Sequence, residues 1–403
     1  MDSTCTESHS PDNDSTPHLG MASSSSRCSD LTRRRTSGIA TPIDRRSGSV
    51  LVQQLVGSPL PAVKCDHCPR LVFEHAETSV WVFFKCEKDR VSAEDWLLVS
   101  PVLFTSVSQR HSTPIDTSFA FLPNHRHIEL LDSCNSLLLC RLHGVFAQGD
   151  DLCYVVWNSA TEKWVMLPDS GQESIFVVIA RLGFTPGISS HFHVFLLVEE
   201  QDQWNPDLSG VAVYSSETGE WVYKENRWNK RIKVIELQLS SAFLNGYLHI
   251  QADGQDLTTC LAVVDTDVET WMNFSVPGGL VNGFIQQSQG RLHYANFQRD
   301  EDRGVFRLVV YVLENYQSKE WILKHSVETS CILGRTDYCI DEFDWIAIHP
   351  ECNLIFFTLG LDLKLMCYNM DRRQVKVICN LEGVKPPYLP YVPLYAELEA
   401  LHI

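Results

Sequence analysis

The sequence predicts an all-β fold, a β-propeller of about six to seven blades, from two recurring elements and their spacing. The first element is an apolar strand, a short polar turn and a second strand with a tryptophan near its start. The four tryptophans that mark it recur at intervals of 57, 50 and 50 residues: Trp164, Trp221, Trp271 and Trp321. Periods of about 40–50 residues built of short strands are typical of radially stacked sheets, because one hairpin cannot bury its apolar face alone.

The second element lies between these hairpins and is a tight polar turn followed by a strand of alternating apolar residues. It occurs at 133–144, 241–252, 288–297 and 349–360. Asn and Gly at such turns tolerate the left-handed backbone that a hairpin requires. Together the two elements give four-stranded units, in which the four tryptophans are predicted to hold equivalent structural positions. A large β-sandwich is the alternative, but sandwiches rarely reach about 300 residues in one domain.

The composition indicates a globular protein of a reducing compartment. The net charge of −17 and the pI near 5.3 argue against general nucleic-acid binding, because phosphate contacts need clustered Lys and Arg. No stretch approaches the length of a membrane-spanning helix and no secretory leader is recognised, so no membrane role is predicted. Six of the 14 cysteines lie in apolar strands, as free thiols do: Cys134, Cys140, Cys153, Cys260, Cys367 and Cys379. We therefore expect the cytoplasm, the nucleus or both.

Residues 1–60 differ from the rest of the chain, because they are rich in Ser, Thr, Asp and Arg and nearly free of aromatic residues. Such a segment cannot bury enough apolar surface to offset the entropy of ordering, so a disordered tail is predicted. Its arginines at 33–35, 45 and 46 fit a nuclear-import or nucleic-acid patch, but comparable acidic charge in the same stretch favours a solvated tail.

A cysteine cluster at 62–97 is the one constellation that suggests a metal. Cys65 and Cys68 have the spacing of a zinc knuckle, and Cys86 ends an aromatic strand. The segment resembles a GRF-type zinc finger, with Phe83–Cys86 as its aromatic-Lys-Cys element. Ala93 stands where that family has its fourth cysteine, and His67 or His75 is the alternative ligand. We predict a degenerate finger with weak zinc affinity, and no other cofactor. The resemblance implies contact with single-stranded nucleic acid, which the missing ligand weakens.

Residues 119–403 resemble the F-box-associated β-propeller domain of plant F-box proteins. The matching segments are IELLDSCNSLLLCR (128–141), YVVWNSATEKWVMLP (154–168), LGFTPGISSHFHVFLLVEE (182–200), VYSSETGEWVYKE (213–225), FLNGYLHI (243–250) and PYLPYVPLYAE (387–397). The resemblance implies a kelch-like or galactose-oxidase-like propeller that recognises the substrate of an SCF-type ubiquitin ligase. It also implies a Skp-type adaptor and a cullin as further partners.

The chain departs from that family ahead of the propeller, where members usually carry a helical F-box. No Leu-Pro start and no C-K-x-W end are found, and 98–118 is predicted to be a linker that retains only the apolar positions Leu103, Phe104 and Val107. Pro101 and the excess of Val, Ser and Thr also disfavour helices. We therefore predict partner recognition by the propeller without docking of the adaptor.

No catalytic site is predicted, so the protein is expected to be a non-enzymatic interaction module. The sequence has no nucleophile elbow, phosphate-binding loop or zinc-protease motif. His191 and His193 could share a metal but have no third ligand, and His249 and His293 hold equivalent repeat positions that suggest a structural role. The repeated tryptophans are predicted to be core residues that hold hairpins together.

The predicted partner surface is a set of long connections: Gln201–Ser209, Asn226–Lys230, Arg299–Gly304 and Thr336–Asp344. Trp204, Trp228 and Trp345 are its candidate partner-binding residues, because loops on a rigid scaffold carry recognition and tryptophans often anchor interfaces. Two alternatives stay open. One is a nucleic-acid-associated protein that uses the GRF-like segment and the Arg-rich tail, and the other is a glycan-binding or sugar-modifying propeller.

Overall fold

The computed structural model describes two short strands and most of the chain from residue 121 onward. The described residues are 81–86, 102–106, 121–122, 127–143, 152–172, 177–199, 207–228, 232–234, 240–253, 259–278, 283–300, 304–334, 343–359, 364–381, 384–396 and 398–401. The chain divides into two compact units, Met1–Gly48 and Ser49–Ile403, and every described residue belongs to the second. The predicted tail at 1–60 and the cysteines at 65 and 68 lie outside the described residues.

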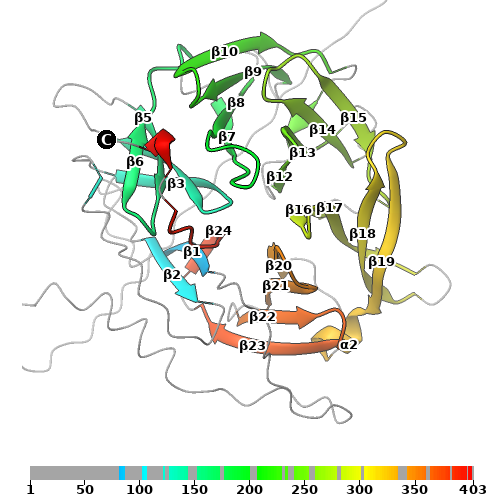
Figure 1. Cartoon of the computed structure of the whole chain (residues 1–403). Coiled ribbons are helices and arrows are strands. Elements are labelled where there is room, and N and C mark those ends of the chain that lie inside the picture. The colour runs from blue at the N-terminus through cyan, green and yellow to red at the C-terminus, as the bar shows by residue number, and fades with distance from the viewer. Residues whose placement is uncertain are drawn as a thin grey trace, which may run out of the picture. The chain divides into compact units, whose positions relative to one another are not determined.

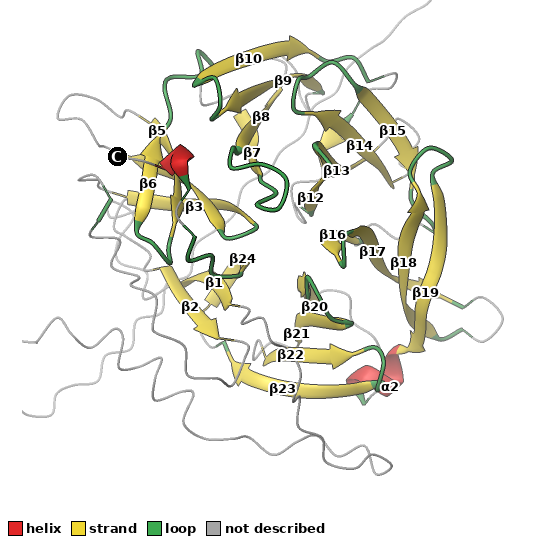
Figure 2. Ribbon diagram, viewed as in Figure 1, coloured by secondary structure: helices red, strands yellow, loops and turns green. Residues whose placement is uncertain are grey.

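Five antiparallel sheets follow one another along the chain and stand side by side as the blades of a ring (Figures 1 and 2). Blade 1 comprises β3 (His127–Cys134), β4 (Leu137–His143), β5 (Leu152–Asn158) and β6 (Lys163–Met166). Blade 2 comprises β7 (Val177–Gly183), β8 (His193–Glu199), β9 (Leu208–Ser215) and β10 (Glu220–Glu225). Blade 3 has an inner strand in two pieces, β11 (Lys233–Val234) and β12 (Ser241–Leu244), followed by β13 (Tyr247–Asp253), β14 (Thr259–Asp265) and β15 (Trp271–Ser275).

The last two blades have the same meander. Blade 4 comprises β16 (Phe284–Ser288), β17 (Arg291–Arg299), β18 (Phe306–Asn315) and β19 (Glu320–Glu328). Blade 5 comprises β20 (Phe343–Ile348), β21 (Leu354–Leu359), β22 (Lys364–Asn369) and β23 (Gln374–Asn380). Helix α2 (Thr329–Leu333) follows β19, and the 3-10 helix η3 (Glu399–Leu401) packs against β5 and β6 near the end of the chain.

A smaller sheet of three strands stands between blade 5 and blade 1. Its order is β2 (Val102–Ser106), β1 (Trp81–Cys86) and β24 (Val384–Tyr391), and β24 lies against both β20 and β3. Strands β1 and β24 are antiparallel, with Trp81 opposite Tyr391. The ring is therefore closed by a sheet that joins a strand ahead of the first blade to a strand after the last one.

The propeller class is confirmed, but the prediction of six to seven blades is wrong, because the structure has five four-stranded blades. The tryptophan spacing gives the length of one blade correctly. Dividing 119–403 by that length overestimates the count, since residues after blade 5 supply the single strand β24 rather than a further meander. The remaining sheet takes its other two strands from 81–106.

The core is distributed between neighbouring sheets rather than gathered at one centre. Successive residues of β8 alternate between two clusters: Val194 and Leu196 pack towards blade 1, and Phe195 and Leu197 pack towards blade 3. Because both faces of each blade are covered, the middle strands read as continuous apolar runs instead of alternating apolar and polar residues. The same arrangement recurs at the boundaries of blades 3 and 4 and of blades 4 and 5.

Candidate partner-binding site

The meander in each blade sorts the connections onto two faces of the ring. At one end of each blade, the first strand is joined to the second and the third strand to the fourth. We call this end of the ring the tight-turn face. It comprises the connections 135–136, 184–192, 245–246, 289–290 and 349–353 and the turns that precede β6, β10, β15, β19 and β23. At the opposite end, the second strand of each blade is joined to the third, and each blade is joined to the next. We call this end the long-loop face. It comprises the connections 144–151, 200–207, 254–258, 300–305 and 360–363 within blades and 167–176, 226–232, 276–283 and 329–342 between blades.

Most of the tight-turn face is stereotyped. Three of its inner turns place two consecutive residues at positive φ, which is the geometry of a two-residue hairpin loop: Asn135 and Ser136, Asn245 and Gly246, and Gln289 and Gly290. Each outer turn has one residue at positive φ two or three places before the outer strand's tryptophan or its equivalent: Glu162, Gly219, Val268, Lys319 and Arg373. Hairpin geometry therefore sets most of this face, and the longer connections 184–192 in blade 2 and 349–353 in blade 5 are the exceptions.

All four connections that the sequence nominated for partner binding leave and re-enter the described strands at the long-loop end of the blades, since each joins either second to third strands or one blade to the next. Trp204 lies outside the described residues. Trp228, in the connection after β10, and Trp345, in β20, are buried between neighbouring blades, with exposed fractions of only 7% and 9%. Trp228 donates a hydrogen bond from Nε1 to the Val263 carbonyl (3.1 Å), and Trp345 stacks on Phe297 with ring centroids 5.2 Å apart. Their indoles offer little surface to a partner.

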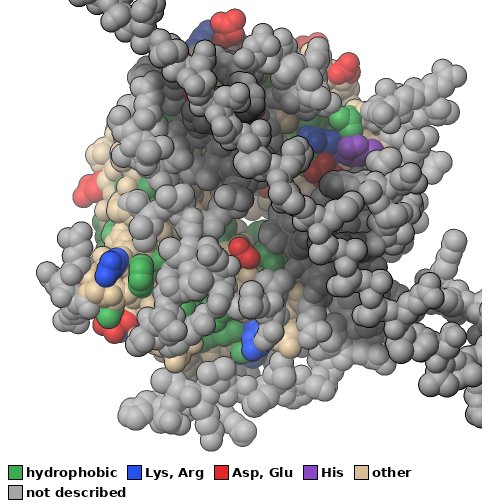
Figure 3. Space-filling model, turned by 180° about the vertical axis from the view of Figure 1, so that it is seen from behind, with side chains coloured by type: hydrophobic (Ala, Val, Ile, Leu, Met, Phe, Trp, Pro, Cys, Tyr) green, Lys and Arg blue, Asp and Glu red, His purple; other side chains and the backbone are tan. Residues whose placement is uncertain are grey.

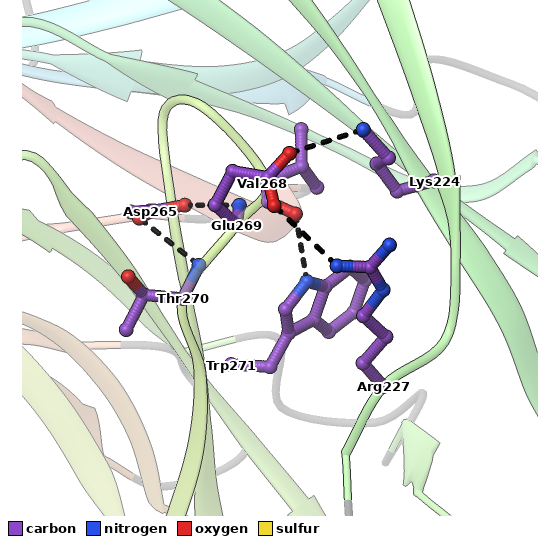
Figure 4. A network of polar contacts seen from close by, with 7 residues as sticks. All are labelled: Lys224, Arg227, Asp265, Val268, Glu269, Thr270 and Trp271. Carbon is purple, nitrogen blue, oxygen red and sulfur yellow. Dashed lines mark hydrogen bonds and ion pairs between the residues drawn. The ribbon is translucent and has the colours of Figure 1, made fainter.

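The repeated tryptophans hold equivalent places, each at the first or second position of its blade's outer strand: Trp164 in β6, Trp221 in β10, Trp271 in β15 and Trp321 in β19. All four are half-buried rather than fully buried. Trp221 donates from Nε1 to the Pro168 carbonyl of the preceding blade (2.9 Å), and Trp271 donates to the Val268 carbonyl in its own turn (2.9 Å; Figure 4). These side chains cover the outer margins of the blades.

A cavity of about 130 Å³ lies at the centre of the ring. The innermost strand of every blade contributes to it, with polar groups from Asp132, Ser133, Asn135, Ser241, Gln286 and Gln287. A polar central cavity is a possible ligand site in any propeller, so the partners of these groups decide its role. Most of them make hydrogen bonds between blades.

An inter-blade belt of side chains, formed by Asp132, Ser133, Asn135, Ser240, Gln286 and Ser288, joins the inner strands around this cavity. Ser133 donates to the Pro390 carbonyl of β24 (2.7 Å), and Ser288 donates to the His349 carbonyl after β20 (2.7 Å). The backbone N–H of Ile285 donates to Ser240 Oγ (2.6 Å). Inner strands have an open edge, and these bonds satisfy backbone groups that a neighbouring strand would otherwise pair.

The belt continues between blades 1 and 2. Asp132 Oδ2 accepts a hydrogen bond from the Leu182 N–H (2.8 Å), and Asn135 Nδ2 donates to the Phe184 carbonyl (2.6 Å). Burial raises the pKa of Asp132, and the nearby Arg181 guanidinium opposes that rise. The belt residues thus hold blades together. They were not predicted from the sequence, although a Ser or Asn beside the turn of an inner strand is a pattern that could have indicated them.

None of the four histidines singled out in the sequence has the surroundings of a metal ligand: two have hydrogen-bond partners in the blades, and the other two have no third ligand nearby among the described residues. His249 contacts the Tyr316 hydroxyl (2.9 Å) and the Ala242 carbonyl (3.1 Å), and His293 contacts Lys324 Nζ (3.1 Å). Burial lowers the pKa of both His249 and His293 to about 4. His191 and His193 gain no third ligand, because the described part of the chain has no group of three His, Cys, Asp or Glu placed to hold a metal.

The predicted zinc site lies largely outside the described residues. Cys65 and Cys68 lie outside the described residues, and Cys86 is described only through its backbone at the end of β1. The GRF-like resemblance stays a prediction.

On the face seen in Figure 3, the described Lys, Arg, Asp and Glu side chains are scattered rather than gathered into a patch of one sign. Among the described residues, no helix has the length and apolar character needed to cross a membrane.

Fold and connections define a propeller in which one face consists mainly of hairpin turns and the opposite face carries the connections between successive blades. Residues 115–383 match the family model of the F-box protein At3g26010-like β-propeller, and the chain belongs to this family. The F-box protein At5g07610 of Arabidopsis thaliana is 22% identical over 291 residues, which cover 66% of each protein. The chain thus spans 66% of the length of this curated relative. The predicted F-box-associated propeller is confirmed.

Solved structures show weaker similarity. A chain in the nidogen/laminin complex is 10% identical with a TM-score of 0.41, over 79% of this chain and 99% of that chain. TolB from Acinetobacter baumannii is 8% identical with a TM-score of 0.43, over 78% of this chain and 66% of that chain.

Proposed function

We propose that the protein is a non-enzymatic interaction module that recognises a protein partner through the long-loop face, like the substrate-recognition part of an F-box ubiquitin ligase receptor. The observation that carries the proposal is that the connections between successive blades and the connections 200–207 and 300–305 leave the blades on one face of a propeller whose family is that of F-box proteins. Recognition usually resides in loops that a rigid scaffold positions. Use of the central cavity for belt hydrogen bonds supports a binding rather than a catalytic role.

The test compares the two faces. We expect a variant in which 200–207 and 300–305 are replaced by Gly-Ser segments of equal length to lose the partners that the intact chain captures from plant extract. The matched control is Ile188→Ser in the β7–β8 connection of the tight-turn face, where Ile188 is 75% exposed. This variant should keep the same partners. Thermal unfolding of all three proteins checks that each is folded. Partners that survive the loop replacement but not Ile188→Ser would place recognition on the opposite face.

The link to a ligase is a separate part of the proposal, because family members usually dock a Skp-type adaptor through F-box helices. Here Val102–Ser106 forms strand β2, paired with β1, in the stretch where the sequence retains its only F-box-like apolar positions. This strand pairing supports the absence of a docking helix there. We therefore propose that adaptor and cullin binding are absent. We also propose that zinc binding by Cys65, Cys68 and Cys86 is weak, and that the protein resides in the cytoplasm, the nucleus or both.

Calorimetry with a purified plant Skp-type adaptor tests whether the chain binds the adaptor. We expect no heat of binding with the full chain at protein concentrations up to about 100 μM, which corresponds to an interaction free energy weaker than about −5.5 kcal/mol. An intact F-box protein serves as the positive control. A complex of micromolar or tighter affinity would contradict the expectation and restore the full receptor assignment.

A further inference from the structure

The outer strand of blade 2, β10, presents an open edge at the rim of the ring. It ends the sheet order β10-β9-β8-β7, so only one of its edges is paired, and Figure 1 shows it running along the outside of the propeller. All six residues pair with β9 without a register shift, from Glu220 opposite Ser215 to Glu225 opposite Gly210. A regular open edge offers backbone N–H and C=O groups to an additional strand.

The outer strands of the other four blades are less suited to pairing with an added strand, for different reasons. Strand β6 has four residues and packs against η3, and β15 has five residues with no exposed large apolar side chain. Strands β19 and β23 have register shifts opposite Val310/Tyr311 and Leu365/Met366, and such bulges twist an edge away from a partner. Among the described blades, β10 alone combines a regular, uncovered edge with exposed apolar side chains.

The centre of β10 is apolar on both sides. Val222 is 46% exposed and Tyr223 is 40% exposed. Val222 shares its side of the strand with Lys224, which reaches Glu269 of blade 3, whereas Tyr223 shares the other side with Trp221, which bonds to blade 1. The Tyr223 ring lies over Gly210 of β9. A Cβ atom at residue 210 would come within 2.5 Å of the Tyr223 hydroxyl, so the ring can lie there because Gly210 has no side chain.

The ends of β10 carry free negative charge. Glu220 and Glu225 are exposed, and neither makes an ion pair with another described residue. The nearby cations are already engaged: Lys224 Nζ and Arg227 Nη1 lie 3.1 and 3.4 Å from the carboxylate of Glu269 (Figure 4).

The turn that carries Glu269 is itself held in place, because Asp265 accepts hydrogen bonds from the N–H groups of Glu269 and Thr270 (2.9 and 3.1 Å; Figure 4). Glu269 therefore stays positioned to neutralise Lys224 and Arg227. The edge is left with apolar residues in its middle and unpaired carboxylates at its ends.

We propose that β10 binds an extended segment of a partner protein as an added strand, and that the segment has the pattern basic-x-apolar-apolar-x-basic. The apolar pair would lie opposite Val222 and Tyr223, and the basic residues opposite Glu220 and Glu225, because directly opposed side chains determine the stability of a strand pair. The pattern reads the same in both directions, so it fits a parallel or an antiparallel strand. This rim surface is separate from the long-loop face and does not rest on the proposed function.

A second copy of the chain fits the edge less well. If β10 pairs with its own copy so that Val222 faces Tyr223, Glu220 comes opposite Glu225 at both ends. Like charges directly opposite each other destabilise a strand pair. A basic partner segment removes this repulsion and replaces it with attraction.

Fluorescence anisotropy with the full chain tests the proposal. The probe is a labelled, terminally blocked peptide Lys-Thr-Val-Val-Thr-Lys, compared with Glu-Thr-Val-Val-Thr-Glu and with a version of the basic peptide that is N-methylated on alternate backbone amides. We expect the basic peptide to bind at least about tenfold more tightly than either comparison peptide, and its binding to weaken as salt increases. Equal binding of the acidic or the N-methylated peptide would overturn strand addition at an acidic edge.

Variants of the chain locate the site. The double variant E220K/E225K should lose about tenfold or more in affinity for the basic peptide. Its matched control, E162K/E320K, changes two exposed glutamates of equal charge beside the tryptophans of blades 1 and 4, and it should bind like the unmodified chain. Unchanged binding by E220K/E225K would overturn the proposal. So would a chain that sediments as a dimer which this variant dissociates, since the occupant would then be a second copy.

Discussion

Replacing Trp228 with alanine is expected to lower the free energy of unfolding by about 3–5 kcal/mol, the range for large aromatic truncations in a core. The indole belongs to the cluster between blades 2 and 3, donates to the Val263 carbonyl and meets Trp271 edge-on with ring centroids 4.5 Å apart. Removal would leave a cavity and would remove the hydrogen bond from the indole to this carbonyl. Urea unfolding followed by circular dichroism measures the loss, with Trp228→Phe as the variant that keeps most of the apolar volume.

Trp271 provides the matched comparison, because it belongs to the repeat but is half-buried. We expect Trp271→Ala to cost about 2 kcal/mol, less than Trp228→Ala, because less apolar surface leaves water in the native state. The double variant should show a coupling of about 0.5–1.5 kcal/mol from the edge-to-face contact. A larger loss for Trp271→Ala than for Trp228→Ala would contradict the assignment of Trp228 to the core.

This pair shows what sequence repetition can predict. The recurrence of Trp164, Trp221, Trp271 and Trp321 reports equivalent backbone positions, which is why the propeller class and the blade length follow from the spacing. Burial is a separate property, because it depends on what the next blade places against each side chain. Trp228 and Trp345 fill boundaries that differ in shape from one blade to the next, so no repeat marks them, and their place in long connections suggested exposure instead.

The candidate surfaces divide in the same way. The long-loop face could be predicted, because strand order alone decides at which end of a blade each connection lies. The blade count could not, since it depends on β24 pairing with β1, a contact between residues about 300 positions apart in the sequence. The open edge of β10 could not be predicted either. What sets it apart from the other outer edges is that η3 packs against β6 and that β19 and β23 have bulges, and none of these features can be read from the sequence.

Acidification is expected to destabilise the protein through its buried histidines, with His249 as the principal group. Its side chain is fully buried, and the two ring nitrogens meet different groups. The Ala242 carbonyl can only accept, so Nδ1 carries the proton, and Nε2 accepts a hydrogen bond from the Tyr316 hydroxyl. This arrangement suits the neutral ring. Burial lowers the pKa of His249 from 6.5 to about 4.

The sign follows from where each state binds the proton. Below pH 6.5 the unfolded chain protonates this histidine while the folded chain does not until about pH 4, so stability is complete above pH 6.5 and falls as the pH drops through this window. The expected loss from His249 is about 2 kcal/mol by pH 5 and about 3 kcal/mol by pH 4. His293, whose pKa burial and Lys324 also lower to about 4, acts in the same direction.

Urea unfolding measured between pH 7 and pH 5 tests this expectation in a range above the titration of most carboxylates. The variant H249N keeps a side-chain N–H that can donate to the Ala242 carbonyl but cannot take up a proton, so it should be less stable at pH 7 and lose stability less steeply on acidification. The double variant H249N/H293N should be flatter still. An H249N profile as steep as that of the unmodified chain would show that the acid sensitivity arises elsewhere and that His249 is protonated in the folded ring.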